Sequence, residues 1–356
     1  MKINIPRLNT TLRFACNIRP NFLWCVLGVL VALAPITVRA QEDLFASING
    51  PDSARLGHIF EYNLTGTQVN TLGTFSNPRG LAFDSAGDLF VATNFFSGDT
   101  SQPAVKEITS RGNRITLGRL PNTFFASGLA IGSSGNVFVM GEAANFTSTI
   151  FEFTPGGTRS VFGTLPGQGL GLTFDSAGNL FAADFSDQTI FKFTPGGASS
   201  IFAGPSAFTS VSGPIGLGFN SAGNLFVSTN SNNVEGADSI LEFAPGGMES
   251  TFATGLTNPR GLAFDSSDNL YVAEIGVPAA PGDILKFTPG GTESTFASGI
   301  GTKVNHGPEW LAIGHPAFTT PDSGSTLLLL TMGLFGLVTW QRCGSHKQRL
   351  DRQTEL

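Results

Sequence analysis

The chain has 356 residues, of which 41% are hydrophobic and 13% are charged, and its formal net charge is −6. The long central stretch, residues 41–320, holds 11 Lys and Arg against 23 Asp and Glu, which excludes nucleic acid as a partner because phosphate binding needs a basic surface. The three cysteines, Cys16, Cys25 and Cys343, lie outside that stretch, so disulfides and thiolate chemistry within it are excluded as well.

The first forty residues have the pattern of a helical signal peptide. A basic leader that begins at Lys2 is followed by an apolar run over residues 22–36, and Val38-Arg39-Ala40 fits a small-x-small cleavage site. We therefore expect residues 1–40 to direct export and Gln41 to become the new N-terminus. The alternative is that the segment stays attached as an anchor helix.

A thirteen-residue phrase then recurs along the chain. It reads GLAFDSAGDLFVA from Gly80, and related phrases begin at Gly128, Gly171, Gly216 and Gly261, at intervals of 48, 43, 45 and 45 residues. A period of about 40–50 residues with short apolar runs and glycine turns is typical of the blades of a β-propeller.

Each repeat predicts four short strands. The first two are the apolar ends of the recurrent phrase, joined by a tight Asp-Ser-Ala-Gly-Asn turn. The third reads Ile-Phe-Glu-Phe at Ile150 and similarly in other copies. A Thr-Pro-Gly-Gly turn follows, as at Thr154, and leads to a fourth strand of the form Ser-x-Phe. Proline followed by glycine predicts a type II turn with the first glycine at its third position.

The two ends of the repeat region complete one another. Residues 310–313 read as a first strand with nothing after it, and residues 44–75 read as a unit that lacks its first strand. Joining them closes a ring of six blades and removes the free sheet edges. The predicted fold is therefore all-β: a six-bladed β-propeller of four-stranded blades over residues 41–316, with the C-terminal strand in the N-terminal blade.

The blade units resemble NHL repeats, most clearly in Asn-Pro-Arg-Gly-Leu-Ala-Phe-Asp at Asn77 and again at Asn258. The resemblance covers residues 43–314 and implies a six-bladed propeller. Propellers of this type mostly bind proteins, glycans or RNA, and some relatives with the same fold are lactonases or lyases.

Six oxygen-bearing residues follow the second strands, on the face where we expect the irregular loops and therefore a binding site. They are Asn49, Asn94, Glu142, Asp184, Asn230 and Glu274. Near the axis such oxygens would suit Ca²⁺, which takes about six to eight oxygen ligands. The set loosely resembles the Glu/Asn/Asp metal site of gluconolactonase-type propellers. The alternative is that each side chain caps the loop that begins there.

Other candidates for ligand contact lie near the same face. Arg79 and Arg260 precede innermost strands and would bind an anionic group or, as we expect, pair with neighbouring acids. His306 and Glu309 share one link and would form an acid/base pair or lie in a solvated loop. We expect Phe124-Phe125 to be buried loop anchors; the alternative is that they stack on a ligand.

The C-terminal residues have the pattern of a sorting signal. A linker over 317–325 contains Pro321, Asp322, Ser323 and Gly324. It precedes a predicted transmembrane helix over 326–341 and a basic tail over 342–356, which would lie in the cytoplasm. This order resembles PEP-CTERM signals of the Val-Pro-Asp-Ser-Gly variant, with Thr320 in place of Val. The resemblance implies exosortase-like sorting machinery as a partner and delivery to the cell envelope; the alternative is a plain tail anchor.

These features predict an exported bacterial envelope propeller that binds or scaffolds an extracellular polymer or protein without catalysis. The alternative is a metal-dependent lactonase- or lyase-like enzyme, in which acids would converge on a bound cation. No Walker phosphate loop, Gly-x-Ser-x-Gly elbow or His-Glu-x-x-His motif occurs in the sequence. The sequence does not name the ligand.

Overall fold

The computed structural model describes residues 42–49, 56–94, 102–208, 212–231, 238–276, 281–301 and 307–315. The predicted signal peptide, the predicted linker with its sorting motif, the predicted transmembrane helix and tail, and His306 all lie outside these residues. Within the described ranges, no helix has the length and apolar character needed to cross a bilayer.

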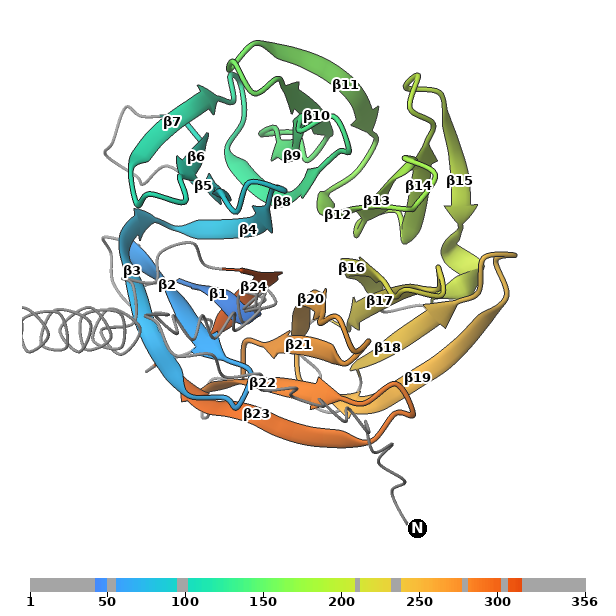
Figure 1. Cartoon of the computed structure of the whole chain (residues 1–356). Helices are drawn as coiled ribbons and strands as arrows, with labels where there is room; N and C mark the ends of the chain where they lie inside the picture. Colours follow the sequence, from blue (N-terminus) through green and yellow to red (C-terminus); the bar gives the residue numbers. More distant parts are fainter. Residues whose placement is uncertain are drawn as a thin grey trace, which may run out of the picture. The chain divides into compact units, whose positions relative to one another are not determined.

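The described strands form six antiparallel four-stranded sheets, the blades, which Figure 1 shows around a common centre. Blade 1 holds β24 (Pro308–Gly314), β1 (Asp43–Ile48), β2 (Leu56–Asn63) and β3 (Gln68–Ser76). Blade 2 holds β4 (Pro78–Phe83), β5 (Leu89–Thr93), β6 (Ala104–Ile108) and β7 (Arg114–Arg119). Blade 3 holds β8 (Phe125–Ile131), β9 (Val137–Glu142), β10 (Ser148–Phe153) and β11 (Arg159–Leu165).

The remaining three blades repeat this arrangement. Blade 4 holds β12 (Gly169–Phe174), β13 (Leu180–Asp184), β14 (Thr189–Phe193) and β15 (Ser199–Ala203), followed by the short 3₁₀ helix η1 (Pro205–Ala207). Blade 5 holds β16 (Gly213–Phe219), β17 (Leu225–Asn230), β18 (Asp238–Phe243) and β19 (Glu249–Leu256). Blade 6 holds β20 (Pro259–Phe264), β21 (Leu270–Glu274), β22 (Gly282–Phe287) and β23 (Glu293–Ile300).

The prediction of six closed blades is confirmed. β24 pairs antiparallel with β1, with Leu44 opposite Ile313 and Ala46 opposite Leu311. The inner strands β24, β4, β8, β12, β16 and β20 contact one another in that order, and β20 contacts β24 again. The ring is therefore closed by strand pairing within blade 1 and by packing between all neighbouring blades.

Phenylalanine side chains form the layers between blades. The ring of Phe138 on β9 meets Phe162 of its own blade and Phe174 of the next at centroid distances of 5.0 and 5.1 Å, in edge-on geometry. Phe181 and Phe226 make the same two contacts in the following blades. Such pairs stabilise by about 0.5–1.5 kcal/mol beyond burial, which gives the phenylalanines of these layers a structural role.

Glycines allow the inner strands to approach one another. Five of the six carry glycine at the same repeat position, and a Cβ there would overlap the next inner strand, as at Gly80 against Ser127 O and at Gly216 against Arg260 O. In blade 1 this position is Trp310, which is 8% exposed.

The predicted type II turn is wrong. The N–H of Gly157 donates to Thr154 O at 2.8 Å, so Gly156 occupies the third turn position, but only Gly157 has a positive φ, of 80°. This is the pattern of a type I turn followed by a left-handed residue, which suits the twist of a three-residue hairpin loop. The second glycine of the motif, not the first, therefore supplies the conformational freedom.

Candidate functional site

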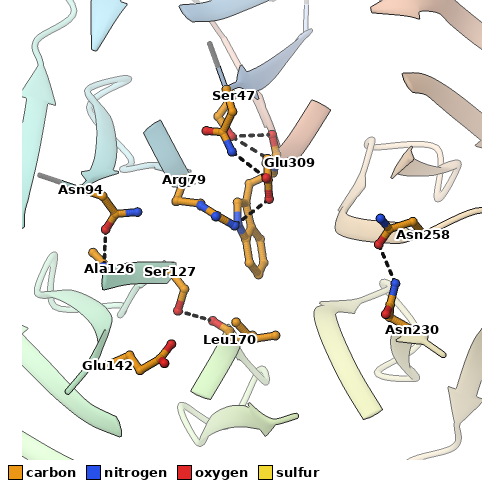
Figure 2. A network of polar contacts seen from close by, with 12 residues as sticks. Ser47, Arg79, Asn94, Ala126, Ser127, Glu142, Leu170, Asn230, Asn258 and Glu309 are labelled. Atoms are coloured by element: carbon orange, nitrogen blue, oxygen red, sulfur yellow. Dashed lines mark hydrogen bonds and ion pairs between the residues drawn. The ribbon is translucent and has the colours of Figure 1, made fainter. Parts of the chain in front are cut away.

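One residue from each inner strand occupies the same repeat position at the start of the strand, and we call this set the axial layer. Its members are Glu309, Arg79, Ser127, Leu170, Ile215 and Arg260. Each inner strand begins on the face that carries the irregular loops, here called the variable face. Figure 2 shows that Arg79, Ser127, Leu170 and Glu309 come together around the axis although they are far apart in the chain.

Glu309 is the acid of the axial layer, and both its oxygens are engaged. Arg79 Nη1 donates to Oε2 at 2.8 Å, and Asn49 Nδ2 donates to Oε1 at 2.6 Å (Figure 2). The Glu309 side chain is 4% exposed, whereas that of Arg79 is 26% exposed. Arg79 therefore pairs with an acid. The predicted pairing of Glu309 with His306 cannot be followed, since His306 lies outside the described residues.

Arg260 occupies the same repeat position as Arg79 but is not held in the same way. No described residue accepts a hydrogen bond from its half-buried guanidinium or forms an ion pair with it. Burial lowers the pKa of Arg260, while the negative charges of Glu309 and Asp238 oppose that change. An arginine stays charged under these conditions, so the axial layer contains a cation without a bonded counter-ion among the described acids.

Each of the six predicted oxygen-bearing residues binds an inner strand or the link that leads into one. Asn94 Oδ1 accepts from Ala126 N, Asp184 Oδ2 from Gly167 N at 2.9 Å, and Glu274 Oε1 from Thr257 N at 2.6 Å.

The other three residues of this set bind side chains. Glu142 Oε2 accepts from Gln168 Nε2 at 3.0 Å, Asn230 Nδ2 donates to Asn258 Oδ1 at 2.5 Å, and Asn49 binds Glu309 as described above. Bonds of this kind fasten loops to the sheets. Among the described residues, no three His, Cys, Asp or Glu side chains gather closely enough to hold a metal ion. Calcium binding by the set stays a prediction.

Burial raises the pKa values of the three acids in this set. It is the largest cause for Glu142, whose pKa is lowered in turn by Gln168 and by the charge of Arg79. For Asp184, hydrogen bonds from backbone N–H groups partly offset burial. For Glu274, burial and the nearby carboxylates raise the pKa to about 7, although the bond from Thr257 lowers it.

The raised pKa of Glu274 predicts a pH dependence of stability. The folded protein holds a proton that the unfolded chain releases near the usual 4.5. The free energy of unfolding should therefore fall as pH rises from about 4.5 to about 7, by on the order of 2 kcal/mol, and then level off. A Glu274→Gln variant keeps an oxygen for the Thr257 N–H but cannot ionise, so it should melt higher than wild type at pH 8. Parallel melting profiles of the two proteins between pH 4 and 8 would contradict this.

Exposed phenylalanines lie on the variable face of blade 3. Phe124 and Phe125 are 49% and 39% exposed, so the prediction that they are buried anchors is wrong. Phe146, which the sequence analysis missed, is 64% exposed and has a φ of 63°. Phe125 on β8 lies opposite Glu142, the last residue of β9, and Phe146 N donates to Ala143 O just after β9, so both phenylalanines are placed at the end of β9. The only available signal for Phe146 was its place in an irregular loop.

Comparisons with known proteins identify the fold. No family model matches the chain, and no curated protein matches it. A catalytically inactive virginiamycin B lyase from Staphylococcus aureus, solved with quinupristin, is 18% identical over 73% of this chain and 86% of that chain, with a TM-score of 0.51. A streptogramin B lyase is 16% identical over 76% and 91%, with a TM-score of 0.53. A Bacteroides caccae protein of unknown function is 13% identical over 77% and 99%, with a TM-score of 0.53. At these identities the likeness concerns the fold alone.

Proposed function

We propose that this chain is an exported bacterial envelope protein whose propeller binds or scaffolds an extracellular polymer or protein through its variable face, without catalysis. The observation that carries the proposal is Phe146, which is 64% exposed and held at a positive φ. A bulky side chain is rarely found there, because the left-handed region costs about 1–2 kcal/mol. An exposed phenylalanine kept at that cost favours a role in contact with a partner.

The neighbourhood of Phe146 supports the same reading. Phe124 and Phe125 add exposed rings on the same face of blade 3. Contiguous exposed apolar groups mark interaction sites, and aromatic side chains are enriched in them. Meanwhile three of the oxygen-bearing residues at the ends of the second strands accept hydrogen bonds from backbone N–H groups of inner strands or of the links before them, and Asp184 also caps its own loop through Asp187 N. Export through residues 1–40 and sorting through residues 317–356 by exosortase-like machinery belong to the proposal.

The test compares two exposed side chains. Phe146→Asn should weaken binding to immobilised bacterial exopolysaccharides or envelope proteins by about tenfold, without lowering the melting temperature, because asparagine tolerates a positive φ better than phenylalanine does. Val161→Asn is the matched control, since Val161 is 61% exposed but lies on the outer strand β11. Equal loss in both variants, or loss in neither, would refute the assignment to this face. Cell fractionation should place the protein in the envelope. Recovery of the protein in the cytoplasm would contradict the proposed export.

The second candidate function is a metal-dependent lyase- or lactonase-like enzyme. It is favoured by the raised pKa of the half-buried Glu274, since perturbed carboxyl groups cluster at active sites. Its fold is also that of a streptogramin B lyase.

Calcium distinguishes this candidate from the binding module. A cation held by the oxygen-bearing set would stabilise the folded state by mass action. We expect millimolar Ca²⁺ to shift the melting temperature by less than about 1 °C, because the three carboxylates of the set already accept hydrogen bonds. A larger rise that disappears on replacement of both Glu142 and Asp184 by Ala would favour the enzyme.

A further inference from the structure

Unpartnered N–H groups are concentrated on blades 1, 2 and 6, which adjoin one another in the ring. Among the described residues, six buried side-chain atoms have no hydrogen-bond partner, and four of them are nitrogen donors: Arg79 Nε, Asn94 Nδ2, Arg260 Nε and Trp310 Nε1. The other two are Oδ1 atoms, of Asp43 and Asn49. Buried polar groups in folded proteins nearly always have partners. This excess of donors indicates a bound group that only accepts hydrogen bonds.

These donors surround one part of the axial layer. Arg79 and Arg260 come from β4 and β20, the two inner strands that flank β24, and Trp310 follows Glu309 on β24. The two guanidinium groups are close enough for the charge of Arg79 to lower the pKa of Arg260. Asn94 belongs to the same region, because its Oδ1 accepts from Ala126 N, beside Ser127 of the axial layer, and this fixes its Nδ2 as a donor.

The charges of this region favour a ligand with a single negative charge. Glu309 already forms an ion pair with Arg79. Two further carboxylates act on these arginines only through space: Glu142 on Arg79, and Asp238 on Arg260. Glu142 accepts from Gln168, and the oxygens of Asp238 accept from Ser231 and Asn258. One guanidinium, that of Arg260, is therefore left without a bonded counter-ion. A carboxylate balances one charge and matches the planar fork of an arginine, whereas a phosphate monoester carries about −1.5 to −2.

The opposite side of the axial layer is apolar. Leu170 on β12 and Ile215 on β16 take the repeat position that Arg79 and Arg260 hold in their own blades. Leu170 is half-buried and Ile215 is 1% exposed. A ligand seated on the axis would meet cations on one side and aliphatic carbon on the other.

We propose that the axial layer binds the carboxylate group of an organic acid, with Arg260 as its main ligand, Arg79 and Trp310 as further donors, and the Leu170 side accepting the carbon body. This inference deepens the proposed function. Binding of a carboxylate does not depend on that function, but the identity of the molecule that carries the carboxylate does; it is an acidic sugar unit or an aliphatic acid.

The experiment titrates the full-length chain by calorimetry at pH 7 and low ionic strength with hexanoate and with glucuronate. Each is compared with its uncharged amide. At least one carboxylate should bind saturably, and its amide should bind at least tenfold more weakly. Binding of hexanoate alone would identify an aliphatic acid, and binding of glucuronate alone would identify a sugar acid. If neither carboxylate binds better than its amide, or if methyl phosphate binds more tightly than both, the inference is overturned.

Variants at the axial layer locate the site. Arg260→Gln should weaken carboxylate binding at least tenfold, and Arg260→Lys should weaken it less because it keeps the charge without the fork. The exposed Arg159 on β11 provides the matched control, so Arg159→Gln should bind like wild type. Unchanged affinity in Arg260→Gln would overturn the assignment.

Stability measurements keep this test separate from misfolding and from the proposed function. Without ligand, Arg260→Gln should melt at or above the wild-type temperature, because no bonded partner is lost; a large decrease would show that Arg260 is a structural residue instead. Arg79→Gln should melt lower, since it removes the ion pair of Glu309. Failure of Phe146→Asn to affect polymer binding would refute the proposed function while leaving carboxylate binding intact, and the reverse result would refute only this inference.

Discussion

Deletion of residues 308–316 should unfold the propeller, whereas a chain that ends after residue 316 should keep the stability of the full-length protein. The deleted segment contains β24, the inner strand of blade 1, which pairs with β1 and packs against β4 and β20. Its loss would leave β1 with an unpaired edge and would open the ring between blades 2 and 6.

The size of this effect follows from burial. Trp310, Leu311 and Ala312 are 8%, 5% and 7% exposed, and Leu311 belongs to the apolar layer that includes Leu44 and Tyr271. Removal of several buried side chains and a full set of strand hydrogen bonds exceeds the stability of about 5–15 kcal/mol that proteins usually have. Circular dichroism and melting curves measure the outcome. Similar melting of the two shortened chains would contradict closure by β24.

A point variant covers the case in which the deletion cannot be produced as soluble protein. Leu311→Ala removes buried carbon without removing the strand and should lower the free energy of unfolding by about 2–5 kcal/mol. Ile201 on β15, which is 64% exposed, is the control position for the Leu311 substitution. Ile201→Ala should change stability by less than about 0.5 kcal/mol. Equal effects at the two positions would mean that β24 is not part of the cooperative core.

The repeat made the fold predictable because each blade has the same pattern of apolar strands and turn residues. Even the closure could be inferred, since residues 310–313 read as a first strand alone and residues 44–75 read as a unit that lacks its first strand. The axial layer was less accessible to prediction. Asn49, Arg79 and Glu309 form one hydrogen-bonded group across 260 residues of sequence, and only the ring brings them together. Sequence pattern shows that a residue carries an oxygen but not which N–H faces that oxygen.

Exposure at the loops was also beyond the pattern. Phe124 is 49% exposed although the sequence analysis predicts a buried anchor, because its position in a link places it on the surface. Phe146 adopts its positive φ in the turn that ends β9, where the bond from its N–H to Ala143 O closes the loop. Both features depend on backbone geometry in irregular segments, for which the repeat supplies no template.

Replacement of Gly216 by alanine should destabilise the propeller strongly although it adds a single methyl group. The added Cβ would overlap Arg260 O of the next inner strand and would lie 2.9 Å from Ser228 Oγ. That hydroxyl accepts from Gly216 N at 2.8 Å and donates to Arg260 O at 2.6 Å, so it joins blades 5 and 6. Neither the strands nor the hydroxyl can yield without breaking these bonds. We expect a loss of about 2–4 kcal/mol, which melting curves would register as a decrease of about 5–15 °C.

Gly246 is the matched control, because a Cβ there meets nothing within 4 Å and its φ is not positive. Gly246→Ala should be neutral or stabilise by about 0.4–1 kcal/mol through the unfolded chain. If both substitutions had equal effects, the glycine of the repeated phrase would serve local backbone conformation and not the approach of neighbouring blades. A large effect at Gly216 and a small one at Gly246 would instead mean that the glycine recurs in five blades because neighbouring inner strands leave no room for a Cβ. In blade 1 this position is Trp310, and its Nε1 is one of the unpartnered donors of the axial layer.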